Sequence, residues 1–115
     1  DMIDIITTGG KEYYIRFGFN ALRIFSNENN LSLSDMDKLG NEISLQQTLS
    51  LIHVGFREGS RKMKQEFTMS IDDVADLLDN DPTIMQRCME IFQEHIGNFT
   101  GEKQEVAKKK EIVQK

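Results

Sequence analysis

Hydrophobic and polar residues alternate in two short runs near the start of the chain, with a pair of glycines between them. The apolar positions of these runs are Ile3, Ile5, Tyr13, Ile15 and Phe17. A period of two is typical of strands that have one buried face. The two runs around Gly9 and Gly10 therefore predict an antiparallel hairpin, which must pack on the remainder of the chain because an isolated hairpin is marginally stable in water.

The length of the connecting loop decides which strand residues face each other. A two-residue turn pairs Ile15 with Asp4, which mixes apolar and charged residues on one face. A three-residue loop, 8–10, pairs Ile15 with Ile3 instead, and its glycines readily adopt the left-handed conformation that such a loop needs. We expect the three-residue loop, because it keeps one face of the hairpin apolar.

After the hairpin, apolar residues recur every three or four positions, which predicts about five short helices. Three of them begin at a serine that has an acidic residue or glutamine three positions later, a pattern that satisfies free backbone N–H groups at a helix start. These serines are Ser34, Ser44 and Ser70. Another helix begins at Asp81-Pro82 and ends at Gly97-Asn98, and one covers 19–27.

The predicted fold class is α+β: an N-terminal β-hairpin packed on a bundle of about five short helices, mainly helical. The helix residues expected to face the core include Phe19, Leu22, Phe25, Leu45, Leu49, Ile52, Phe56, Ile84, Met85, Cys88, Met89, Ile91, Phe92 and Ile96. Residues 1–98 are expected to form a single globular domain. Residues 99–115 hold five lysines and three glutamates, and are expected to be a charged C-terminal tail, either a frayed helix or disordered.

Composition narrows the class of protein without indicating a function. The chain has 115 residues, of which 38% are hydrophobic and 29% charged, as in ordinary soluble domains. Its net charge of −5 argues against a protein that binds DNA or an anionic membrane. Cys88 is the one cysteine, so no intrachain disulfide can form and a reducing compartment is expected. No apolar run reaches the roughly 18 residues that a membrane span needs.

No arrangement of side chains in the sequence is typical of catalysis, cofactor binding or a metal site, so an enzyme is not expected. His53, Cys88 and His95 are the conventional ligand types, but a zinc site needs three or four ligands, usually at close spacing. A buried thiol and surface or helix-end imidazoles are the better interpretation. The acidic run 72–81 has apolar residues at helical spacing and lacks the glycine of a calcium loop, which indicates the solvated face of a helix.

Other features of the helices bear on contacts. Gly55 and Gly59 share one face of the longest helix, where each glycine costs about 1 kcal/mol relative to alanine. A close helix crossing or a kink would offset this cost, and a locally weak helix explains the glycines equally well.

The six methionines suit adaptable binding surfaces, with core packing as the alternative for most of them. The basic patch at the end of the same helix consists of Arg57, Arg61, Lys62 and Lys64.

Five stretches form an ordered series over roughly residues 3–98. They are GKEYYIRFGFNALRIF at 10–25, LSLSDMDKL at 31–39, TLSLIHVGFREGSRK at 48–62, TMSIDDVADLLD at 68–79 and CMEIFQEHIGN at 88–98. Taken together, the series resembles the tail assembly chaperones of long-tailed (siphovirus-type) bacteriophages and prophages of Gram-positive bacteria. No single stretch is a catalytic signature, and the resemblance lies in their order.

The resemblance implies a non-enzymatic adaptor of the host bacterial cytoplasm that is absent from the mature virion. Such proteins bind the tape measure protein, keep it soluble and recruit major tail tube protein subunits around it, without a cofactor, nucleic acid or membrane. The resemblance is compatible with either a monomer or a homo-oligomer. Many are made in two forms by a programmed ribosomal frameshift near the 3′ end of the gene, and the lysine codons of 108–110 would suit a slippery run.

An adaptor of this kind needs an apolar groove to receive a helix of the tape measure protein. We expect such a groove at the longest and last helices. The partner-binding residues predicted there are Gly55, Phe56, Gly59, Met85, Met89 and Phe92. The alternative functions are a small structural phage protein, such as a head–tail connector or tail component, and a regulatory nucleic-acid-binding module, which the net charge disfavours.

Overall fold

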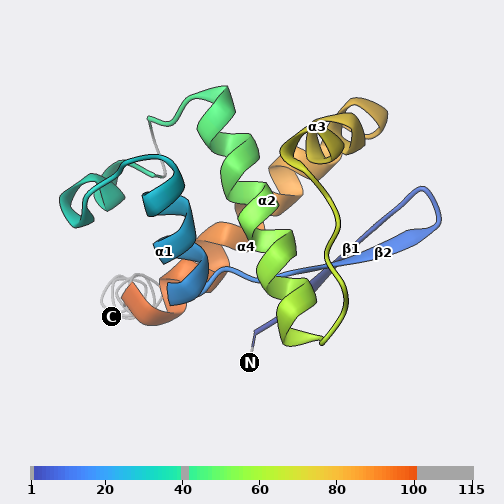
Figure 1. Ribbon diagram of the computed structural model, residues 1–115, viewed down its shortest axis with the longest axis horizontal. Coiled ribbons are helices and arrows are strands. Elements are labelled where there is room, and N and C mark those ends of the chain that lie inside the picture. Colours follow the sequence, from blue (N-terminus) through green and yellow to red (C-terminus); the bar gives the residue numbers. More distant parts are fainter. Residues whose placement is uncertain (1, 40–41, 101–115) are drawn as a thin grey trace, which may run out of the picture.

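The computed structural model describes residues 2–39 and 42–100, which form one hairpin and four α-helices (Figure 1). The strands are β1 (Asp4–Thr8) and β2 (Lys11–Ile15). The α-helices are α1 (Phe19–Glu28), α2 (Leu45–Lys62), α3 (Ile71–Asn80) and α4 (Thr83–Thr100), and the 3₁₀ helix η1 (Leu33–Lys38) follows α1. The predicted α+β class with an N-terminal hairpin is confirmed.

The described residues form four α-helices where about five helices were predicted, and the remaining predicted helix is the 3₁₀ helix η1. The segment predicted to begin at Ser34 is a 3₁₀ helix of six residues, which is long for this type. Its N-cap is Ser32 and not Ser34, because the Ser32 N–H donates to Asp35 Oδ2 over 2.8 Å. The start signal was therefore placed two residues too late.

The hairpin has a two-residue turn, so the predicted three-residue loop was wrong. Gly9 and Gly10 both have positive φ, 58° and 75°, as a type I′ turn requires. Ile15 consequently pairs with Asp4. The prediction failed because it demanded an apolar inner face, whereas Asp4 has a polar partner there, the side chain of His95.

The predicted capping signals of the later helices are confirmed. Ser44 Oγ accepts from the Gln47 N–H, and the Ser44 N–H donates to the Gln47 side chain, each over 3.0 Å. Ser70 and Asp73 make the same reciprocal pair at the start of α3. Asp81 caps α4 by accepting from the backbone N–H two residues later. These bonds satisfy N–H groups that have no partner within a helix.

Helix α2 is the centre of the domain and contacts β2, α1, α3 and α4 (Figure 1). Its buried apolar side chains are Leu51, Ile52, Val54 and Phe56, which cover more than one face. The prediction that Leu45 faces the core was wrong, because its side chain is 67% exposed. Phe19, also predicted to face the core, is 73% exposed. Each is the first residue of its helix, at the edge of the packed region.

The two glycines of α2 allow β2 and the segment after it to lie directly against the helix. A Cβ atom on Gly59 would come within 2.3 Å of the Tyr14 carbonyl, and one on Gly55 within 2.6 Å of the Phe17 ring. The Arg16 N–H also donates to the Gly55 carbonyl over 3.0 Å. The close approach expected from these glycines therefore involves the hairpin strand and not another helix.

Helix α4 continues to Thr100, beyond the end predicted at Gly97-Asn98. Gly97 is buried within the helix. The remainder of the predicted C-terminal tail, 101–115, lies outside the described residues. None of the helices in the described ranges combines the length and the apolar character that crossing a bilayer requires.

Candidate functional site

The six residues predicted to bind a partner do not share one surface. Both glycines of α2 lie beneath β2 and the segment that follows it. Phe56 and Phe92 are 1% and 2% exposed and belong to the core, where the Phe92 ring meets the Phe17 ring edge-on. Met85 is 38% exposed and Met89 is half-buried on α4. Of the six, the two methionines are the ones that a partner could reach in this conformation.

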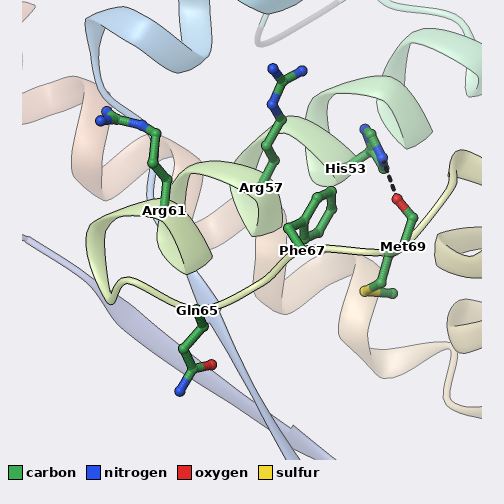
Figure 2. A pocket seen from close by; sticks show the side chains of 6 residues that line it. All are labelled: His53, Arg57, Arg61, Gln65, Phe67 and Met69. Atoms are coloured by element: carbon green, nitrogen blue, oxygen red, sulfur yellow. Dashed lines mark hydrogen bonds between the residues drawn. The ribbon is translucent and has the colours of Figure 1, made fainter.

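A pocket of about 480 Å³ opens on the polar face of α2, where this helix meets the connector 63–70. Its lining residues are His53, Arg57, Arg61, Gln65, Phe67 and Met69 (Figure 2). The first three are four positions apart, which places them along one face of the helix. The other three belong to the connector, which leaves the end of α2 through Lys64, a residue with a φ of 57°.

Arg61 is held in place by a carboxylate of the same helix. Glu58 accepts hydrogen bonds from Arg61 Nε and Nη2, each over 2.9 Å. The Glu58 side chain is 2% exposed, whereas that of Arg61 is 53% exposed. The bond from Arg61 lowers the pKa of Glu58 against the opposing effect of burial, and a side-chain bond from Asn20 of α1 lowers it further. The pair stays ionised and leaves the other N–H groups of the guanidinium available to a ligand.

The connector supplies the apolar side of the pocket. His53 Nε2 lies 2.8 Å from the Met69 carbonyl oxygen, which can only accept, so the imidazole donates from Nε2. The His53 and Phe67 rings are 5.2 Å apart in an edge-on arrangement. Figure 2 shows the Phe67 ring between the side chains of Arg57 and His53. These contacts fix an aromatic side chain against the face of α2 that carries His53 and Arg57.

This combination of side chains suits an acidic ligand with an apolar part. Guanidinium groups bind carboxylates and phosphates through pairs of hydrogen bonds, and the Phe67 ring and Met69 thioether suit apolar groups. The basic patch predicted from the sequence supplies Arg57 and Arg61. Phe67 and Met69 were missed, because an irregular connector has no periodicity that could reveal them. In the described ranges, no three His, Cys, Asp or Glu side chains gather as a metal site.

His95 and Cys88 lie in the core, away from this pocket. His95 is 2% exposed, so the predicted surface or helix-end position was wrong. Its Nδ1 accepts from the Phe17 N–H over 3.0 Å, and its Nε2 lies 2.9 Å from Asp4 Oδ2. Cys88 is buried as predicted, and burial raises the pKa of its thiol to about 12. Such a thiol is a poor nucleophile at neutral pH.

Comparisons of the chain with protein-family models, with curated proteins and with solved structures found no match. The pocket on α2 and the ordered series of sequence stretches are therefore the two features that bear on function.

Proposed function

We propose that this protein is a tail assembly chaperone of a long-tailed bacteriophage or prophage. In this role it is a non-enzymatic adaptor that binds the tape measure protein, keeps it soluble and recruits tail tube subunits around it. It acts in the cytoplasm of the bacterial host and leaves before the virion is complete.

The observation that carries the proposal is the ordered series of five sequence stretches that resemble such chaperones. The stretches span β2 with α1, then η1, α2, α3 and the greater part of α4. They therefore cover nearly every element of one small domain, including most of the core and four of the six residues that line the pocket. A resemblance confined to one helix would carry much less weight, because amphipathic helices look alike in many unrelated proteins.

The pocket on α2 supports the same proposal. A tape measure protein is long and helical, and its apolar stripes would aggregate if they were left exposed. An adaptor that holds such a helix needs a concave surface with polar groups for orientation and an apolar wall for contact. Arg57 and Arg61 provide the polar groups, and Phe67 and Met69 provide the apolar wall.

Co-expression tests the proposal. The gene is expressed in bacteria together with the very long reading frame expected immediately downstream, and the soluble fraction of the long product is measured. We expect the soluble fraction of the long product to rise when this chain is co-expressed, and the long product to co-purify with this chain. With an unrelated acidic protein of similar size, the long product should stay insoluble. A long product that is equally insoluble with and without this chain would contradict the proposal.

A further inference from the structure

We propose that the pocket between α2 and the connector 63–70 binds an acidic segment of the partner protein. Carboxylates of that segment pair with Arg57 and Arg61, and a neighbouring apolar side chain packs on Phe67 and Met69. The inference rests on the proposed function only for the identity of the partner as the tape measure protein. The chemistry of recognition is argued from the pocket alone.

The two arginines form the cationic side of the pocket. They are one helical turn apart, so their side chains leave the same face of α2, and Figure 2 shows their guanidinium groups pointing apart from each other. Glu58 holds Arg61 through two hydrogen bonds of 2.9 Å, which removes much of the freedom that binding would otherwise have to restrict. Arg57 is exposed and adds a positive charge, whereas the charge of Arg61 is paired with that of Glu58.

The apolar wall beside the arginines is also preset. Phe67 and Met69 are half-buried, so part of each side chain remains open to solvent. His53 holds both positions, through the hydrogen bond to the Met69 carbonyl and the ring contact with Phe67. A segment that presents an acidic and an apolar side chain on one face can therefore meet both halves of the pocket at once.

Charge distribution favours a protein segment over a nucleic acid. The chain carries a net charge of −5, and the exposed Asp72 and Asp73 follow Met69 closely along the chain, in the first turn of α3. A regular series of phosphates running past the pocket would meet these carboxylates, and the residues that line the pocket include one Phe and no Tyr or Trp for base stacking. A short segment with its carboxylates at the arginines avoids that repulsion, and a local cationic site on an acidic protein orients an acidic partner.

Binding of a synthetic peptide tests the inference. The probe is a fluorescein-labelled helix of about 15 residues that carries glutamate and leucine on one face. The control probe has glutamine in place of each glutamate. We expect fluorescence anisotropy to show that the acidic probe binds at least about tenfold more tightly than the control, because hydrogen bonds to a charged group are the stronger ones. Binding should weaken as salt is added.

Two matched charge reversals locate the site. Arg57→Glu reverses a charge in the pocket, and Arg87→Glu reverses one at an exposed position of α4. Arg57→Glu is expected to lower the affinity for the acidic probe at least about tenfold, and Arg87→Glu to lower it by less than about twofold. Circular dichroism and urea denaturation confirm that both variants fold. Equal binding of the two probes, no binding of the acidic probe, no effect of Arg57→Glu, or tighter binding of a single-stranded oligonucleotide would each overturn the inference.

The same variants separate this inference from the proposed function. If the co-expressed tape measure protein is captured by the wild type and by Arg87→Glu but lost with Arg57→Glu, both are supported. Equal capture by all three proteins overturns the acidic-segment inference and leaves the chaperone function standing. Capture by none of them, while the acidic probe still binds, overturns the chaperone function and leaves the recognition chemistry standing.

Discussion

At the scale of single residues, His95 joins three separate parts of the chain. A backbone N–H can only donate, so His95 Nδ1 accepts from Phe17 and the ring proton lies on Nε2, directed at Asp4. His95→Ala leaves the Phe17 N–H unsatisfied in the core and is expected to lower the unfolding free energy by about 2–3 kcal/mol. Urea denaturation measures this loss.

Asp4→Asn is the matched control for His95→Ala, because asparagine retains an oxygen that can accept from Nε2. We expect this substitution to cost less than about 1 kcal/mol. Similar losses for the two variants would show that the charge of Asp4, and not the pair of hydrogen bonds to the imidazole, supports the structure at this point.

Cys88 gives a second prediction at this scale. The thiol is buried and its pKa is raised to about 12, so almost none of it is thiolate at neutral pH. We expect a disulfide reagent such as dithionitrobenzoate to react with the native protein at the rate of global unfolding, and immediately in denaturant. Rapid reaction of the folded protein would contradict the buried position.

Glu58 makes stability depend on pH. Its pKa in the folded protein lies below the usual 4.5, chiefly because Arg61 hydrogen-bonds the ionised carboxylate. The stabilisation is complete above the unfolded pKa and is lost as the pH falls through the lower folded pKa. In urea denaturation from about pH 7 down to about pH 3, the wild type should lose more stability than Glu58→Gln. Parallel curves for the two proteins would contradict this.

At the scale of elements, the contact between α2 and β2 depends on the absence of two side chains. Gly59→Ala gains about 1 kcal/mol of helix propensity. Its Cβ, however, would lie 2.3 Å from the Tyr14 backbone, which cannot rotate away as a side chain can. We expect a net loss of about 2 kcal/mol in unfolding free energy.

The neighbouring Ser60→Ala is the control for Gly59→Ala, since it changes helix propensity at a half-buried position and is expected to alter stability by less than about 0.5 kcal/mol. Gly55→Ala should cost less than Gly59→Ala, because it meets the Phe17 ring and not backbone. A stabilised Gly59→Ala variant would show that β2 can move off the helix without cost.

Elements were predictable from the sequence where their cause is local. The caps of α2 and α3 join residues three positions apart, and both were predicted correctly. The register of the hairpin follows from the two-residue turn at Gly9 and Gly10, which is a local signal. The prediction rejected that turn because the partner of Asp4, His95, lies 91 positions away and no local pattern indicates it. The exposure of Leu45 likewise depends on where the core ends and not on the period of the helix.

At the scale of the whole molecule, the sequence predicts the residues that α2 contributes to the pocket but not those of the connector. Arg57 and Arg61 stand out because a helical period places them on one face. Phe67 and Met69 join them only because the connector 63–70 packs along α2 and is held there by His53. The residues that the sequence favoured as a groove, Phe56 and Phe92 among them, are apolar for another reason, since they fill the core.

Tail assembly in the phage or prophage that encodes this chain is the most direct test of the chaperone function. With the gene deleted, electron microscopy should show heads without tails, and the wild-type gene supplied in trans should restore complete particles. Mass spectrometry of those purified particles should detect none of this protein. Normal tails in the absence of the gene, or a stoichiometric amount of the protein in finished particles, would contradict a chaperone function; the second result would indicate a structural component.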